Sequence, residues 1–195
     1  RKALQVPVGI DTDFFKPNAL VPRKPNSILF LGRIAPIKNV EIFVNALNEL
    51  RKLGVEFSAT IAGPVLPKDA EYEKLIHDKV SACNLNDKVK FVGSVTQVEA
   101  LKLYQEHELY VNLTPSGSMD KTIFEAMACG VTSLVYNDSL SSVLREKYLI
   151  KNLGAQDIAE DIKRTMSKEH KDFRDYVIEN HSIELLARKL FVEQK

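Results

Sequence analysis

The sequence has few cysteines, no long apolar run and no excess of charge of one sign. Cys83 and Cys129, the only cysteines in 195 residues, cannot build a disulfide framework or a zinc site by themselves. The 27 lysines and arginines nearly balance 26 aspartates and glutamates, so the basic signature of a nucleic-acid-binding protein is missing. No run approaches the ~18 apolar residues of a membrane span, and no signal peptide is recognisable. We therefore expect a reducing, cytoplasmic setting and no nucleic-acid partner.

Short apolar runs, typical of buried strands, alternate with segments of helical periodicity. Strands are expected at 28–31, 57–62, 89–92, 109–113 and 132–136, with an edge strand at 148–150. Helices are expected to span 40–50, 72–80, 98–104 and 122–129, and a helical tail to begin at residue 155. This alternation predicts an α/β fold: a Rossmann-like three-layer sandwich with a parallel sheet.

The chain divides into three predicted parts. Residues 1–26 contain four prolines and no glycine-rich phosphate turn, so they are predicted to be an interdomain lead-in. Residues 27–168 are the predicted Rossmann-like domain, and residues 169–195 a C-terminal helical tail. Because the lead-in is more typical of a linker than of a protein's beginning, we expect the chain to be half of something larger.

Ligands of open parallel sheets bind outside the carboxyl ends of the strands, and two segments there carry promising chemistry. Arg33 and Lys38 lie on one loop before a helix, where paired cations suit an anion. They could stabilise a departing diphosphate, which gains negative charge as its bond breaks. The alternative is that both are solvated loop residues.

The second segment is the polar loop 114–122, which opens a helix and whose backbone N–H groups could hold phosphate oxygens. Glu125, one turn into that helix, could accept hydrogen bonds from two adjacent ribose hydroxyls. The alternative is a capping box of Thr122 and Glu125 that only stabilises the helix start. Met119 and Met127 are interpreted as packing residues. The four histidines show no metal-ligand spacing, and most are expected to be solvated.

Four segments carry a family resemblance. Val6–Pro17 has the pattern of an interdomain lead-in, Ile28–Lys38 of a strand with a G-R-x-x-x-x-K phosphate loop, and Phe91–Val95 of an F-x-G-x-V strand. The most diagnostic stretch is 124–131, FEAMACGV. In this order and spacing they resemble the C-terminal half of a GT-B retaining glycosyltransferase of glycosyltransferase family 4. The resemblance extends from Val6 to about Val135.

The resemblance implies roles for individual residues. Arg33 and Lys38 would bind the donor's diphosphate and stabilise the leaving nucleotide, which is the catalytic contribution expected of this half. Glu125 would hold the donor ribose, and backbone from Gly93 to Val95 would contact the nucleobase. The loop 118–122 would lie against the diphosphate and the transferred sugar. The expected substrate-binding residues are Gly32, Arg33, Lys38, Gly63, Gly93, Val95, Ser118, Met119, Asp120, Lys121, Thr122 and Glu125.

The sequence departs from the family pattern in the loop before Glu125. Gly117 stands where the family commonly has the first of two glutamates, and residues 118–121 replace the usual G-F-G-L. That glutamate normally acts near the transferred sugar, so the departure affects sugar identity and part of the catalytic arrangement. Asp120 could substitute for it, whereas Lys121 is interpreted as a solvated surface lysine rather than a phosphate contact.

The resemblance implies a donor-binding domain for a nucleotide-diphosphate sugar, in a hexosyltransferase acting on a glycan or lipid-linked acceptor. No metal or other cofactor is expected, and the chain should be inactive without the N-terminal GT-B domain that carries the acceptor site. Many relatives build envelope polysaccharides, so peripheral association with the inner face of a membrane would fit. Two alternatives stay open: a non-catalytic nucleotide-binding or interaction module, favoured by Gly117, and, ranking lower, half of a nucleotide-sugar epimerase.

Overall fold

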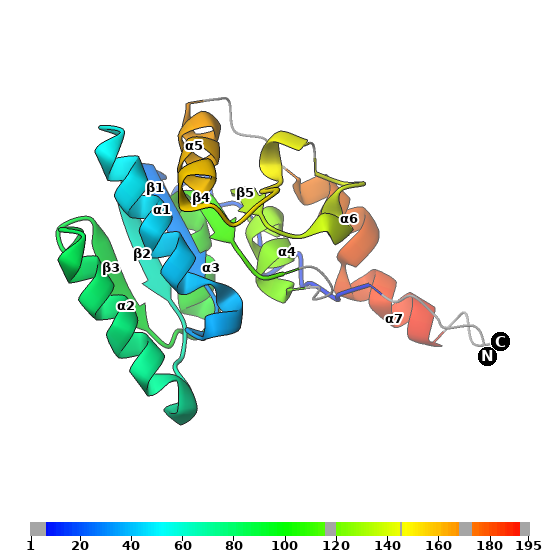
Figure 1. The fold of residues 1–195 in the computed structure, drawn as a ribbon. Coiled ribbons are helices and arrows are strands. Elements are labelled where there is room, and N and C mark those ends of the chain that lie inside the picture. The colour runs from blue at the N-terminus through cyan, green and yellow to red at the C-terminus, as the bar shows by residue number, and fades with distance from the viewer. Residues whose placement is uncertain (1–6, 116–119, 145, 168–172, 192–195) are drawn as a thin grey trace.

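The computed structural model describes residues 7–115, 120–144, 146–167 and 173–191. Within these ranges a five-stranded parallel sheet forms the middle layer, in the order β3-β2-β1-β4-β5 (Figure 1). The strands are β1 (Lys24–Leu31), β2 (Ser58–Ala62), β3 (Val89–Gly93), β4 (His107–Asn112) and β5 (Thr132–Val135).

Helices cover both faces of this sheet (Figure 1). One face carries α1 (Val40–Lys52), α2 (Ala70–Ala82) and α5 (Ala155–Met166), and the other carries α3 (Gln97–Glu106) and α4 (Lys121–Ala128). The chain then continues into α6 (Arg174–His181), which packs on α4, and α7 (Ile183–Phe191). None of the helices in the described ranges combines the length and apolar character needed to cross a bilayer.

The two cores explain the unbroken apolar run in the second half of β1. Side chains alternate between the faces of a strand, so Ile28 and Phe30 pack beneath α1 while Leu29 and Leu31 join the core beneath α3 and α4. A parallel sheet buried on both faces requires apolar residues at successive positions. The predicted α/β sandwich with a parallel sheet is confirmed.

The strand order reverses between β1 and β4. From β1 the chain moves outward through β2 to β3, then returns to place β4 on the other side of β1. Ile28 of β1 is therefore paired with Ala59 of β2 and with Leu109 of β4. At this reversal the loop after β1 leads to α1 on one face of the sheet, and the loop after β4 leads to α4 on the other face. This is where α/β sheets commonly form a ligand crevice.

The lead-in and the tail pack against each other. Ile10 forms an isolated parallel bridge with Ser182, donating its N–H to the His181 carbonyl at 2.7 Å and accepting from the Ile183 N–H at 2.8 Å. The guanidinium of Arg174 donates to the backbone carbonyls of Thr12, Phe15 and Ala128. Residues near the start of the chain are thus tied to α4 through the tail, while the predicted boundaries at 26 and 168 stay predictions.

The expected edge strand and some of the expected strand limits were wrong. The expected edge strand at 148–150 is reduced to one parallel bridge between Val135 and Leu149, because Tyr148 ends the 3-10 turn η4 (Glu146–Tyr148). Strand β1 begins at Lys24 rather than at residue 28, since its first residues are exposed and polar and carry no apolar pattern.

Candidate functional site

Three glycines that the sequence analysis expected to bind substrate, Gly32, Gly63 and Gly93, lie side by side at the carboxyl ends of β1, β2 and β3. The N–H of Gly32 donates to the Ala62 carbonyl at 2.9 Å, and the N–H of Gly63 donates to the Gly93 carbonyl at 2.8 Å. Gly63 has a φ of +143°, and a Cβ added there would lie 1.9 Å from the Gly32 carbonyl oxygen. The backbones of β1 and β2 therefore approach at their ends more closely than a side chain at Gly63 would allow.

Lys38 joins the loops that follow β1 and β4. It ends the 3-10 turn η1 (Pro36–Lys38), just before Asn39 turns the chain into α1 with a φ of 57°. Its Nζ donates to Asp120 Oδ2 at 2.5 Å and to Thr114 Oγ1 at 3.1 Å. The side chain is 18% exposed, so the alternative of a solvated Lys38 was wrong.

Asp120 is the N-cap of α4 and the centre of a polar network. Its Oδ1 accepts from the N–H and hydroxyl of Thr122, while Oδ2 also accepts from the Asn112 amide and the Thr114 hydroxyl, both at 3.2 Å. Burial works to raise the pKa of Asp120, but the charge and hydrogen bonds of Lys38, with those of Thr122 and Asn112, outweigh it and leave the pKa below its usual value. Asp120 is a carboxylate at neutral pH.

Beneath this network lie polar side chains that the sequence analysis did not select. The Tyr110 hydroxyl donates to the Leu31 carbonyl, accepts from the Asn112 amide at 2.9 Å and lies 2.6 Å from Thr122 Oγ1. Burial raises the pKa of Tyr110 far above its usual value, so the phenol stays neutral. An amide and a phenol within the apolar run 109–113 were the signal that could have identified them.

Glu125 is held inside α4 rather than at the helix start. The buried Tyr104 hydroxyl of α3 donates to its Oε2 at 3.2 Å, and Lys121 Nζ lies 4.0 Å from its Oε1. Burial raises the pKa of Glu125, and the hydrogen bond from Tyr104 and the charge of Lys121 only partly offset this. The capping-box alternative was wrong, because Asp120 accepts from the Thr122 N–H and caps the helix.

The remaining predicted site residues that the structure describes do not join the polar network around Asp120. Arg33 is exposed on the same loop as Lys38 and makes no hydrogen bond or ion pair with any residue that the structure describes. Lys121 is exposed, as expected for a surface lysine. Met127 is fully buried, as expected for a packing residue. Gly93 is exposed at the end of β3, with the half-buried Val95 just beyond it. Ser118 and Met119 lie outside the described residues.

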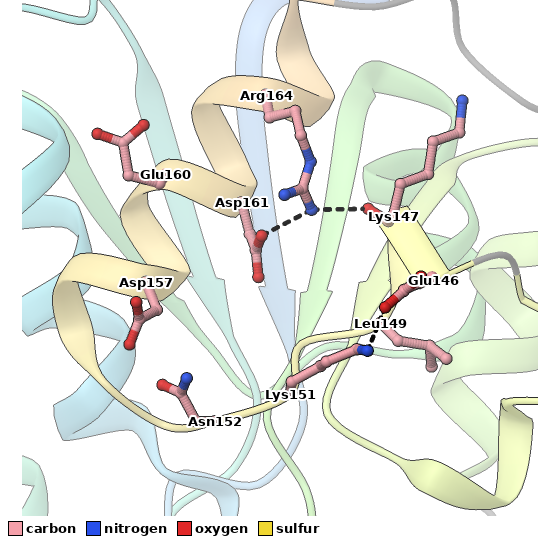
Figure 2. Close-up of a pocket in the computed structure, with 9 residues that line it drawn as sticks. All are labelled: Glu146, Lys147, Leu149, Lys151, Asn152, Asp157, Glu160, Asp161 and Arg164. Atoms are coloured by element: carbon pink, nitrogen blue, oxygen red, sulfur yellow. Dashed lines mark hydrogen bonds and ion pairs between the residues drawn. The ribbon is translucent and has the colours of Figure 1, made fainter.

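A pocket of about 650 Å³ lies elsewhere, between η4 and α5 (Figure 2). Charged residues of both signs line it and pair with one another: Arg164 contacts Asp161 at 2.6 Å, and Lys151 contacts Glu146. It includes none of the predicted site residues. In the part of the chain that the structure describes, no three His, Cys, Asp or Glu side chains gather as metal ligands would.

Comparison with known proteins identifies the family of the chain. Residues 11–183, which include the strand-end loops described above, match the family described as Glycosyl transferases group 1. The chain belongs to this family. Its fold matches the C-terminal domains of GT-B glycosyltransferases. One such domain, from the group 1 glycosyltransferase LpcC of Francisella tularensis, has a TM-score of 0.75 at 22% identity over 90% of this chain and 100% of that one.

One curated relative and one further solved structure resemble this chain. The lipopolysaccharide core biosynthesis mannosyltransferase LpcC of Rhizobium leguminosarum bv. viciae is 29% identical over 108 residues, which are 55% of this chain and 30% of that protein. HepE of Anabaena, crystallised with UDP and glucose, has a TM-score of 0.83 at 16% identity, over 93% of this chain and 54% of HepE. The chain thus spans about half of HepE, and its match covers less than a third of the Rhizobium protein.

Proposed function

We propose that this chain is the nucleotide-sugar donor-binding domain of a retaining glycosyltransferase of family 4. The observation that carries the proposal is the meeting of Lys38 with the N-terminus of α4 where the strand order reverses, with Glu125 one turn further along the helix. A relative named as a mannosyltransferase and another crystallised with UDP and glucose support it. The whole protein would transfer a hexose to a glycan or lipid-linked acceptor at the cytoplasmic face of a membrane.

Each part of the site would have a separate task. Arg33 and Lys38 would face the diphosphate and stabilise the charge that it gains as the bond to the sugar breaks, with no cofactor. The buried carboxylate of Glu125 would accept hydrogen bonds from the ribose, and the exposed backbone at Gly93 would contact the base. Arg33, Gly93 and Lys121 are exposed to solvent, so a second domain would be needed to exclude water, and this half alone would not turn over.

The proposal is tested by titrating UDP, GDP and ADP into the chain by calorimetry. One of the three should bind best, and Arg33→Ala or Glu125→Ala should weaken it by about tenfold each, since each removes a hydrogen bond to a charged group. Arg188→Ala, which removes an exposed arginine from α7, is the matched control and should change nothing. An Arg33→Ala, Glu125→Ala double variant with wild-type affinity would rule the proposal out.

A non-catalytic nucleotide-binding module is the second candidate, and the pairing of Lys38 with Asp120 favours it because that lysine's charge is already matched. Both candidates predict nucleotide binding, so transfer distinguishes them. The full-length protein should release nucleoside diphosphate from a nucleotide sugar only when an acceptor is added. Binding without any release would identify a non-catalytic module, whereas interconversion of free nucleotide sugars would indicate an epimerase.

A further inference from the structure

We propose that Asp120 is a positioning residue that holds the Lys38 ammonium and limits how tightly the site retains a nucleoside diphosphate. The proposal rests on the proposed function, because it takes the diphosphate to lie against Lys38. The juxtaposition that carries it is the 2.5 Å contact between Lys38 Nζ and Asp120 Oδ2, whose side chains are only 18% and 10% exposed. Such shielded pairs are screened by salt much less than surface pairs.

The contact changes what Lys38 offers a ligand. An ammonium group has three N–H donors. One is directed to Asp120 Oδ2 and one to Thr114 Oγ1, so among the residues that the structure describes a single N–H is left for a phosphate oxygen. The formal charges of Lys38 and Asp120 cancel, so Lys38 acts as an oriented hydrogen-bond donor more than as a free cation. Arg33, exposed on the same loop, is then the main attraction for an anion.

Asp120 is too firmly held for a ligand to displace. Both of its oxygens accept hydrogen bonds: one from Thr122 of α4, and the other from Asn112 at the end of β4 and Thr114 in the loop after it. Turning the carboxylate away would leave these donors without their partner, which is costly at a shielded site. An arriving diphosphate therefore meets a fixed carboxylate beside the lysine that it contacts.

The carboxylate should discriminate between donor and product. A nucleotide sugar has one ionised oxygen on each of its two phosphates, whereas the released nucleoside diphosphate has a terminal phosphate that ionises a second time near pH 6. The product is the more negative of the two at neutral pH, so repulsion by Asp120 acts more strongly on it. Product release limits turnover in many enzymes, and a fixed anion at this position would speed it.

The test is Asp120→Asn, because asparagine is also a good N-cap and keeps the shape while it removes the charge. At low ionic strength, the Kd of the best-bound nucleoside diphosphate should fall by about threefold to tenfold. The Kd of the matching nucleotide sugar should fall less. Asp120→Glu keeps the charge and should not tighten diphosphate binding.

The matched control is Glu56→Gln, which removes a carboxylate from a lysine pair, with Lys88 at 2.9 Å, before the amino ends of β2 and β3. It should leave both affinities unchanged. The wild-type chain gives a measurement that does not depend on any variant folding: it should bind the nucleoside diphosphate no more tightly than the nucleotide sugar. A tenfold wild-type preference for the nucleoside diphosphate would overturn the inference by itself.

The outcomes separate this inference from the function on which it rests. If Arg33→Ala and Glu125→Ala weaken binding but Asp120→Asn leaves the ratio of the two Kd values unchanged, the role of Asp120 is refuted and the donor-binding function stands. If the wild-type chain binds none of the three nucleoside diphosphates at millimolar concentration, the proposed function fails, and the role of Asp120 fails with it.

Discussion

The pKa values of two carboxyl groups near the start of α4 are shifted in opposite directions by neighbouring groups. Asp120 has an ammonium in direct contact, so its pKa is below the usual value despite burial. Glu125 has a phenol at 3.2 Å and an ammonium only at 4.0 Å, so burial dominates and its pKa is raised. The start of α4 therefore presents two carboxyl groups, of which Glu125, with its raised pKa, takes up a proton before Asp120 as the pH falls.

Tyr104→Phe should weaken ribonucleotide binding, because it removes the hydroxyl that orients Glu125. We expect a loss of about threefold to tenfold, the usual size for one hydrogen bond to a charged group. The pKa of Glu125 should rise further, so the loss of binding on acidification should begin at a higher pH. The measurement is the Kd of a ribonucleoside diphosphate between about pH 5 and about pH 8.

A ligand comparison gives the control for this prediction. A 2′,3′-dideoxynucleoside diphosphate lacks the hydroxyls that Glu125 would hold, so Tyr104→Phe should leave its affinity unchanged. Tyr72→Phe removes a phenol that accepts from the Glu41 N–H on the sheet face opposite to the one that carries Glu125, and should affect neither ligand. An equal loss for the ribo and dideoxy ligands would show that Tyr104 acts on packing rather than on Glu125.

Gly63→Ala should destabilise the fold by about 3 kcal/mol, because its Cβ would overlap the backbone of Gly32. Gly54→Ala is the matched comparison, since Gly54 also has a positive φ, +71°, but has open space around the added Cβ. It should cost only about 1 kcal/mol, the ordinary penalty for a left-handed alanine. Denaturant unfolding measures both, and equal losses would contradict the close approach of β1 and β2.

At the scale of elements, α4 depends on its two ends. It has eight residues, and isolated helices this short are not stable in water. Asp120 caps its first turn, while at the other end Arg23 donates to the carbonyls of Cys129 and Gly130 and Arg174 donates to that of Ala128. Guanidinium groups at a helix C-terminus satisfy its free carbonyls and complement the helix dipole.

Arg174→Met should lower the free energy of unfolding by about 2–3 kcal/mol, because three backbone carbonyls lose a charged donor. Arg188→Met on the exposed side of α7 should change it by less than about 0.5 kcal/mol. Thermal and denaturant unfolding give the comparison. If the two variants are equally stable, the bracing of α4 by the tail contributes nothing measurable.

The sequence predicted these elements well where apolar residues define them. The runs around Ile28 and Leu109 are buried strands as expected, because burial on both faces leaves a continuous apolar signal. The capping-box alternative for Thr122 and Glu125 was wrong, because their spacing fits such a box but the helix begins one residue earlier and is capped by Asp120. The contacts of Lys38 with Thr114 and Asp120 join loops distant in sequence, and only the strand order brings those loops together.

At the scale of the whole molecule, we expect two buried histidines to make the free energy of unfolding depend on pH. Contrary to the expectation of mostly solvated histidines, His107 and His181 are buried, and burial lowers the pKa of each below 6.5. The unfolded chain therefore binds these protons first as the pH falls. Stability should be fully present above about pH 7 and decrease as the pH falls below about 6.5.

We expect a loss of about 1 kcal/mol between about pH 7.5 and about pH 5.5, measured by denaturant unfolding at each pH. In His107→Gln the free energy of unfolding should change less between the two pH values than in the wild type, since one of the two buried imidazoles is gone. His77→Gln, at an exposed position, should keep the wild-type difference. If the free energy of unfolding of His107→Gln changes with pH as much as that of the wild type, His107 does not contribute to the pH dependence.

The bridge between Ile10 and Ser182 has a mechanical consequence. A displacement of the chain at Ile10 would reach the start of α7 through that bridge. A displacement at Thr12 or Phe15 would reach the last turn of α4, because Arg174 donates to the carbonyls of both residues and to that of Ala128. The position of the helix that bears Glu125 is therefore coupled to the position of residues 10–15.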